Sequence, residues 1–389
     1  MPETLRLPTA DGGLTGYHVQ GDFRYPNTGT PATSRIAYAA VHVVADPLSD
    51  TTPVSPPAID WEATMAFRRH IWSYGLGVAD AMDTAQRGMG LDWDAARELI
   101  TRSVAEANGA GGRIVCGVQT DQLPQGSART LRDVEAAYEE QCEFVEAQGG
   151  QVVLMASREL ARIAKSADDY QQVYDRVLSG LAQPALIHWL GEVFDPQLAG
   201  YWGSDDLDVA MTTLLEIIDA NRANVEGLKL SLLDQRRELE MRPRLPAGVH
   251  IFTGDDFDYP TAIAGSDGYY SDALLGAFDA IAPAASAALL ALDAGDRERF
   301  ETILEPTLPL SRHIFKAPTY FYKTGIVFLA YLNGHQDHFR MVGGLESGRS
   351  TVHLAELFVL ADRAGLLRDA ELAVDRMRRV LSVFGVEQS

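Results

Sequence analysis

The chain of 389 residues is long enough for one large domain or two ordinary ones, and its apolar and charged fractions are typical of a soluble globular protein. Its 54 acidic residues outnumber its 33 basic residues, which gives a formal net charge of −21. No basic stripe offsets this charge, so nucleic acid and anionic membrane surfaces are excluded as expected partners.

Targeting signals and cysteine usage predict the compartment. No apolar run reaches the roughly 18 residues that span a bilayer. The stretch "MPETLRLPTADGG" has neither the basic region nor the apolar core of a secretory signal. The two cysteines, Cys116 and Cys142, form no disulfide framework and have no zinc-type spacing. We therefore expect a cytoplasmic protein.

Eight short apolar or β-branched runs, bounded by turn residues, are predicted to be strands. They are residues 35–44, 76–82, 113–118, 151–156, 184–190, 225–231, 249–254 and 268–271. Most are separated by amphipathic segments such as "DWEATMAFRRHIWSYG", "DWDAARELITRSVAEANG" and "DLDVAMTTLLEIIDANRAN". The first two begin at an aspartate suited to N-capping, which predicts helices that start there.

Strands that alternate with helices in this way predict an α/β fold, the (β/α)₈ or TIM barrel. Barrel strands are apolar on both faces because helices cover the outside. After about residue 273 the pattern is wholly helical, which predicts a C-terminal helical extension. The predicted domains are an irregular N-terminal lead-in (1–34), the barrel (35–280) and the helical extension (281–389).

The stretch "NVEGLKLSLLD" (224–234) places Lys229 in a short, otherwise apolar strand. Lysine is rarely buried without a partner, because desolvating its ammonium group is costly. Near the C-terminal end of a barrel strand, burial would lower the pKa of the amine and make it a nucleophile that forms an imine with a carbonyl compound. Gly227 and Ser231 would point in the same direction. The structural alternative is that Lys229 reaches out of the strand to pair with Asp234.

Five segments carry a resemblance to a known family. They are "VEGLKLS", "VHIFTGDDFDYPTAIAGSDGYYS", "RIVCGVQTDQ", "ALDAGDRERFETILEPTLPL" and "IFKAPTYFYKTGIVFLAYLNG". They resemble the dihydrodipicolinate synthase and N-acetylneuraminate lyase superfamily of class I aldolases, over roughly residues 35–370. More narrowly, the chain is similar to a divergent bacterial branch of unknown function, labelled "dihydrodipicolinate synthase family protein". The resemblance implies a TIM barrel, a homodimer or homotetramer, no cofactor, and Lys229 as the imine-forming lysine.

Two departures from the family pattern concern the substrate. The family's carboxylate-binding "GTTGE" loop corresponds to "DTAQRG", where Thr84 matches one threonine and Ala85 replaces the other. Gln86 and Arg87 are predicted to contact an acid group instead, since guanidinium suits carboxylates; the alternative is that Arg87 faces solvent. The family's proton-carrying tyrosine is missing, because "VLMASREL" stands where the family has "PYY". Pyruvate and lysine biosynthesis are therefore not implied.

Other polar residues at predicted strand ends are candidates for proton transfer and substrate binding. His188 is the leading proton carrier, because histidine titrates near neutral pH; the alternative is a hydrogen-bonded histidine of the barrel wall. Asp83, Asp255, Tyr270 and His42 are further candidates for substrate contacts. Such residues also cap helices or pack, so a structural role stays open for each.

The predicted function is that of a Schiff-base-forming class I lyase, an aldolase or dehydratase acting on a small keto acid or a sugar-derived carbonyl compound. One alternative is a metal-dependent aldolase or isomerase with a divalent metal held by histidines and carboxylates at the strand ends. The set considered is His42, Asp46, Asp83, His188 and Glu192. A second alternative is a catalytically silent barrel that binds a small molecule.

Overall fold

The computed structural model describes residues 4–27 and 29–388 of the chain. These residues form two compact units. One contains residues 35–41 and 77–275; the other contains the described residues among 4–27, 29–34, 42–76 and 276–388.

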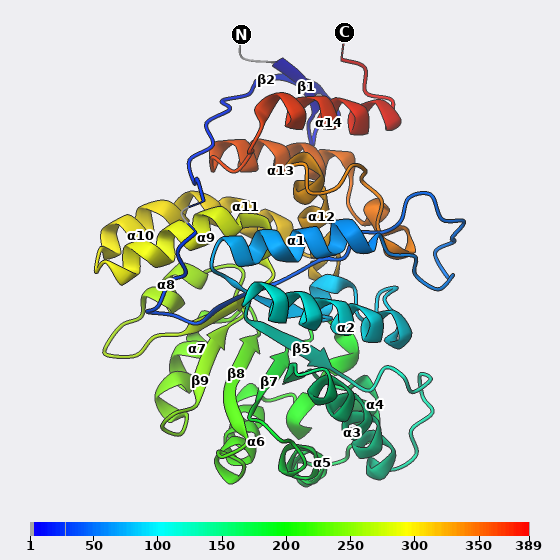
Figure 1. Cartoon of the computed structure of the whole chain (residues 1–389), viewed down its shortest axis with the longest axis vertical. Coiled ribbons are helices and arrows are strands. Elements are labelled where there is room, and N and C mark those ends of the chain that lie inside the picture. The colour runs from blue at the N-terminus through cyan, green and yellow to red at the C-terminus, as the bar shows by residue number, and fades with distance from the viewer. Residues whose placement is uncertain (1–3, 28, 389) are drawn as a thin grey trace. The chain divides into compact units, whose positions relative to one another are not determined.

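Residues 35–275, all of which the structure describes, contain eight parallel strands that close into a barrel in the order β10-β3-β4-β5-β6-β7-β8-β9. Strands β7, β8 and β9 lie side by side in Figure 1. The bounds are β3 Ala37–Ala40, β4 Gly77–Asp80, β5 Ile114–Val118, β6 Gln151–Leu154, β7 Ala185–Leu190, β8 Val225–Ser231, β9 His250–Thr253 and β10 Asp272–Leu275. The predicted (β/α)₈ barrel is confirmed.

The barrel strands are buried on both faces, as their continuous apolar sequences predicted. Their inward side chains form one core cluster. Its members are Tyr38, Ala40, Ala79, Met82, Val115, Val153, Met155, Leu186, Phe252 and Leu274. Because side chains alternate along a strand, the cluster members on seven of the eight strands identify the inward positions there, and the register with β9 extends this to β8.

Helices follow the strands within the barrel unit. They are α2 Trp93–Ala110, α3 Leu131–Ala147, α4 Arg158–Ile163, α5 Ala167–Ser179, α6 Leu207–Ala220, α7 Gln235–Met241 and α8 Tyr259–Ala264. The expected start of α2 is confirmed, because the Asp92 carboxylate accepts a hydrogen bond from the Ala95 amide at 2.9 Å. At the start of α3, Thr130 and Asp133 form a reciprocal capping box.

The position predicted for the eighth strand is wrong. Residues 268–271 lie before β10, which runs over Asp272–Leu275. The preceding "GSDGYY" forms a turn in which Gly265, Asp267 and Gly268 have φ of 75°, 53° and 82°. These left-handed conformations are incompatible with a strand, so the eighth strand begins after them, at Asp272.

The other unit is mainly helical. Its helices are α1 Trp61–Ser73, α9 Ala277–Asp293, α10 Arg297–Leu304, α11 Leu308–Phe315, α12 Tyr322–Leu332, α13 Thr351–Arg363 and α14 Ala370–Val383. Asp60 caps α1, as predicted. The N-terminal segment, predicted to be irregular, contains the antiparallel strands β1 Thr4–Pro8 and β2 Leu14–His18.

Distant segments of the chain meet within this helical unit. The Tyr17 hydroxyl donates to Asp362 at 2.7 Å, and the Arg6 amide donates to the Gln388 side chain at 2.9 Å. Strand β1 lies beside α13 (Figure 1). The hairpin therefore forms because the C-terminal helices supply its partners, which local sequence does not reveal.

Among the described residues, no helix is both long and apolar enough to cross a membrane.

Candidate active site

Lys229 points into the barrel from β8. The strand register pairs Lys229 with Phe252 of β9, and Phe252 belongs to the interior core. Only 6% of Lys229 is exposed to solvent. Within the part of the chain that the structure describes, its Nζ makes no hydrogen bond and no ion pair. The amine is therefore buried, inward and unpaired.

Three residues lie beside the Lys229 side chain: one on β7, one on β8 itself and one directly after β9. His188 of β7 lies directly across from Lys229 in the strand register. Ser231, two residues further along β8, points the same way, and its Oγ lies 3.1 Å from His188 Nε2. A methyl group on Gly254 would stand 3.2 Å from Lys229 Cε and 2.2 Å from Ser231 Oγ. Both side chains thus pack against Gly254, where only glycine leaves them room.

Two effects act on the lysine charge in opposite directions. Burial lowers the pKa of Lys229 from its usual 10.5, and the negative charges of Asp83 and Asp256 oppose this shift without cancelling it. Asp83 lies in the short turn after β4, and Asp256 in the turn after β9. Asp234, the partner considered in the structural alternative, instead caps α7 by accepting from the Arg237 amide. That alternative is wrong.

His188 is fully buried beside the lysine. Burial, and then the positive charge of Lys229, hold the pKa of His188 well below 6.5. The ring is therefore neutral at physiological pH and can accept a proton. Its Nδ1 is buried and has no hydrogen-bond partner among the described residues.

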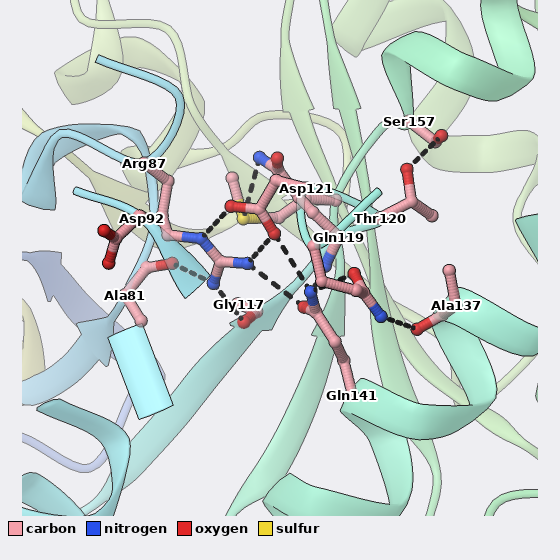
Figure 2. A network of polar contacts seen from close by, with 12 residues as sticks. Ala81, Arg87, Asp92, Gly117, Gln119, Thr120, Asp121, Ala137, Gln141 and Ser157 are labelled. Atoms are coloured by element: carbon pink, nitrogen blue, oxygen red, sulfur yellow. Dashed lines mark hydrogen bonds and ion pairs between the residues drawn. The ribbon is translucent and has the colours of Figure 1, made fainter. Parts of the chain in front are cut away.

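Arg87 has a different role from the one predicted, as Figure 2 shows. Its guanidinium donates to both carboxylate oxygens of Asp121, at 2.8 and 2.5 Å. The remaining donors bond to the Ala81 and Gly117 carbonyls and to Gln141 Oε1. All five N–H groups of the side chain are thus used. Arg87 joins the ends of β4 and β5 and retains no donor for a substrate carboxylate.

The rest of the predicted anion-binding loop is also buried. Thr84 and Gln86 are each 1% exposed, and the Gln86 amide donates to the Met89 carbonyl at 3.1 Å. Gln86 has φ of 68° and Ala81, at the end of β4, has φ of 51°. Left-handed conformations at non-glycine residues are often found at functional sites. Here they shape the turn that carries Asp83.

Asp255, a predicted substrate contact, and its neighbour Asp256 lie in the turn after β9. The Asp255 carboxylate accepts from the Phe257 amide at 2.9 Å, so it holds the turn together. Burial raises the pKa of Asp255 from its usual 3.8. Asp256 is the member of the pair whose charge acts on Lys229. Local sequence does not distinguish Asp256 from Asp255, because side chains in a turn do not alternate between two faces as they do along a strand.

Tyr270 does not lie at the predicted place. It comes before β10, at the amino-terminal edge of the barrel, whereas active sites of such barrels lie at the carboxyl ends of the strands. Its ring covers the guanidinium of Arg35, with 3.7 Å between Arg35 Cζ and the ring centre. A substrate contact from Tyr270 is therefore not supported.

His42 belongs to the helical unit. Its Nδ1 lies 2.7 Å from the Asp279 carboxylate, which also accepts from the His42 amide. The His42 ring packs on Phe67, with ring centres 4.3 Å apart. The role predicted for His42 in substrate binding stays a prediction.

The residues considered as metal ligands do not gather in one cluster. His42 and Asp46 belong to the helical unit, while Asp83, His188 and Glu192 belong to the barrel unit. Asp46 binds the Leu48 amide and the Ser49 hydroxyl of its own loop. No group of three potential metal ligands is found among residues 4–27 and 29–388.

Two cavities of ligand size lie beyond the carboxyl ends of the barrel strands. One, of about 310 Å³, is lined by Gly88, Gly90, Leu91, Asp92, Gln119, Thr120, Asp121, Leu123, Gln125, Arg158 and Glu159. The other, of about 450 Å³, is lined by Trp189, Leu190, Gly191, Glu192, Val193, Leu198, Ala199, Gly200, Tyr201, Ser204, Asp205, Leu207 and Leu232. Lys229 is in neither lining. The first is lined in part by Asp121, the residue that Arg87 binds in Figure 2. The second is lined by residues at the ends of β7 and β8 and in the segments that follow them.

Sequence reasoning missed Glu238, a buried carboxyl group on α7. It is 1% exposed and accepts hydrogen bonds from the hydroxyls of Thr253 and Ser271 at 2.9 and 2.5 Å. Burial raises the pKa of Glu238 from 4.5 to about 7, against the opposing effect of these bonds. Nothing in the local helical pattern distinguishes Glu238 from an exposed glutamate.

Glu238→Gln is expected to change how stability depends on pH. The folded state holds this proton more tightly than the unfolded chain between pH 4.5 and about 7, so the wild type loses stability as pH rises through that window. At pH 8 the variant should be more stable than the wild type by about 3 kcal/mol, and at pH 4.5 the two should agree within about 1 kcal/mol. Urea unfolding across this range measures the difference. Glu301→Gln, at an exposed site, is the control, and a pH-independent difference would contradict the assignment.

Solved structures with this fold include dihydrodipicolinate synthases. A 4-hydroxy-tetrahydrodipicolinate synthase from Methylacidiphilum fumariolicum SolV has a TM-score of 0.64 at 14% identity, covering 88% of this chain and 99% of that chain. The dihydrodipicolinate synthase of Bacillus clausii has a TM-score of 0.61 at 16% identity, covering 84% and 97%. A putative dihydrodipicolinate synthetase from Pseudomonas aeruginosa has a TM-score of 0.60 at 15% identity, covering 83% and 99%.

These similarities define the class: a barrel with the fold of the dihydrodipicolinate synthases. At such identities they establish the fold alone. The chain belongs to the family described as "Protein of unknown function (DUF993)", which matches residues 5–386. None of the curated proteins matches it.

Proposed function

We propose that the protein is a class I lyase in which Lys229 forms a Schiff base with a small keto acid or a sugar-derived carbonyl compound. One observation carries this proposal: Lys229 is buried, points into the barrel and has no ion-pair partner in the described chain. Burying a lysine costs free energy, and no hydrogen bond or ion pair of the Lys229 amine in the described chain offsets that cost.

The first step is addition of the neutral amine to the substrate carbonyl. The nitrogen lone pair forms the C–N bond, and the carbonyl oxygen leaves as water with two protons, one from the lysine amine and one from the solvent. The product is a protonated imine. Because burial lowers the pKa of Lys229, a larger fraction of the amine is neutral and able to react at physiological pH.

The carboxylates of Asp83 and Asp256 support the second step. The protonated imine carries a positive charge at the position where the amine was neutral, so the two negative charges stabilise it more than they stabilise the free base. The imine then accepts the electron pair of a neighbouring bond. If a carbon–carbon bond breaks, the reaction is that of an aldolase; if a hydroxyl group leaves, it is that of a dehydratase.

Borohydride trapping tests the proposal. The protein is incubated with pyruvate, 2-oxobutanoate, hydroxyacetone and dihydroxyacetone, reduced, digested and examined by mass spectrometry. We expect at least one compound to add its reduced mass to the peptide that contains Lys229, while the peptides with Lys165, Lys316 and Lys323 stay unmodified. Failure of all four compounds, or equal labelling of all four lysines, would count against a Schiff-base enzyme.

Assembly and compartment are part of the same proposal. A homodimer or homotetramer is proposed from the resemblance to the dihydrodipicolinate synthase superfamily. A cytoplasmic location is proposed because Cys116 and Cys142 are both buried free thiols, which is usual in a reducing compartment. The proposed reaction needs no cofactor.

A further inference from the structure

A buried hydroxyl–imidazole pair lies next to Lys229. Ser231 is 2% exposed, and its Oγ lies 3.1 Å from His188 Nε2. This distance is that of a hydrogen bond, in which either group can supply the proton. The pair is separate from the carboxylates Asp83 and Asp256, whose charges act on the lysine.

The strand geometry places the Ser231–His188 pair on the same side of the sheet as the Lys229 amine, where the imine would form. Ser231 and Lys229 are two residues apart on β8 and therefore project from the same face. Both side chains contact Gly254, so Ser231 Oγ and Lys229 Cε lie close to each other at this glycine. His188 lies across from Lys229 in the register and approaches Ser231 from β7.

We propose that Ser231 carries protons between His188 and the carbon next to the Lys229 imine. This inference rests on the proposed function and names the proton carrier of that site. In the dihydrodipicolinate synthase superfamily, which this chain resembles, a tyrosine carries the proton. This chain has "VLMASREL" at that position, with no tyrosine.

The proposed transfer conserves atoms and charge. The proton on the carbon beside the imine moves to Ser231 Oγ, while the serine's own proton moves to His188 Nε2. The electron pair of the broken C–H bond becomes the C=C bond of an enamine, and the C=N π pair becomes a lone pair on the lysine nitrogen. The positive charge passes from the imine to the imidazole, so the total charge near Asp83 and Asp256 is unchanged.

The buried state of the pair suits this transfer. Burial, and then the nearby lysine, hold the pKa of His188 well below 6.5, so the ring is neutral before the transfer. When the imine becomes an enamine, the positive charge on the lysine nitrogen is lost, which removes one of the two effects that oppose protonation of His188. With the proton on Nδ1, which has no partner in the described chain, Nε2 is the acceptor that faces Ser231.

The test separates imine formation from proton transfer. The wild type, Ser231→Ala and His188→Gln are each trapped with borohydride and the same four carbonyl compounds. Exchange of the hydrogens beside the carbonyl group is then followed in deuterated water by proton NMR. We expect both variants to form the Lys229 adduct to within about threefold of the wild type, and to exchange at least about 100-fold more slowly.

Two further variants control for structure. Ser286→Ala removes another buried serine hydroxyl, one that donates to the Tyr74 carbonyl at 2.7 Å, and should exchange at the wild-type rate. Ser231→Thr keeps a hydroxyl and should restore the exchange that Ser231→Ala loses, provided thermal melting shows an unchanged fold. If Ser231→Ala forms the adduct and exchanges at the wild-type rate, the proton carrier is another group and this inference falls. If the wild type forms no adduct, the proposed function and this inference both fall.

Discussion

Lys229→Met is expected to abolish the Schiff base and to lower turnover at least about 10³-fold. Methionine nearly matches the length and apolar character of the lysine stem but has no amine, so the imine cannot form. Because the variant also removes a buried group that must lose its hydration, it should be more stable than the wild type by about 1 kcal/mol or more. Trapping, turnover and thermal melting measure the two effects on the same preparation.

Loss of turnover together with a gain in stability would distinguish a catalytic Lys229 from a structural one. A lysine that only stabilised the barrel would give a variant that is less stable. Lys323→Met is the matched control, since Lys323 is also buried but lies in the helical unit, with its Nζ bonded to the Tyr320 carbonyl and over the Tyr322 ring. Full activity in Lys229→Met would refute the proposed function.

The small number of lysines also permits a direct measurement. Labelling lysine with ¹³C at the ε carbon should give four resonances, and Lys229→Met identifies the one that disappears. That resonance should titrate below the usual lysine value of 10.5, because burial lowers the pKa of Lys229. Titration of the Lys229 resonance at or above 10.5 would contradict the electrostatic basis of the mechanism, and this test needs no substrate.

Asp121→Ala is expected to have the largest effect on stability. The Arg87 side chain is fully buried, and Asp121 supplies the only negative charge among its hydrogen-bond partners in the described chain. Burial alone would raise the pKa of Asp121, but Arg87 and Gln141 hold it below its usual 3.8, so the carboxylate is charged at neutral pH. Removing it leaves a buried guanidinium uncompensated, which should cost about 3 to 5 kcal/mol in urea unfolding.

A double variant and a variant of an exposed ion pair are the controls for Asp121→Ala. Arg87→Met combined with Asp121→Ala removes both charges and should recover much of the loss, because neither charge is then left alone. Glu98→Ala breaks the exposed Arg102–Glu98 pair and should change stability by less than about 1 kcal/mol. If Asp121→Ala lowered stability no more than Glu98→Ala does, the Arg87 guanidinium would not depend on Asp121. The predicted contact of Arg87 with a substrate acid group would then be a hypothesis again.

The barrel and its buried lysine were predictable because each depends on local pattern. Continuous apolar runs identify strands of a parallel sheet, and one lysine within such a run stands out. The eighth strand was misplaced because "GYYS" has the aromatic residues of a strand, while the left-handed turn that displaces it depends on backbone conformations around Gly265 and Gly268.

The side chains around the lysine were harder to predict. Asp83 and His188 follow from strand ends, but Arg87 was assigned to a substrate because its partner Asp121 lies 34 residues away and on another strand's loop. Likewise, Glu238 is held by Thr253 and Ser271, which reach it from two other segments. Pairings between distant segments are set by the closed barrel and are invisible in any local window.

The helical unit draws on three separate stretches of the chain, 1–34, 42–76 and 276–389, with the barrel segments between them. Its completion therefore has to wait until the last helices leave the ribosome, which implies a high contact order and slow folding. A chain shortened at residue 275 would keep β1, β2 and α1 but lose the helices that bind them. Such fragments should be prone to aggregation, so excising the barrel cleanly would require circular permutation rather than truncation.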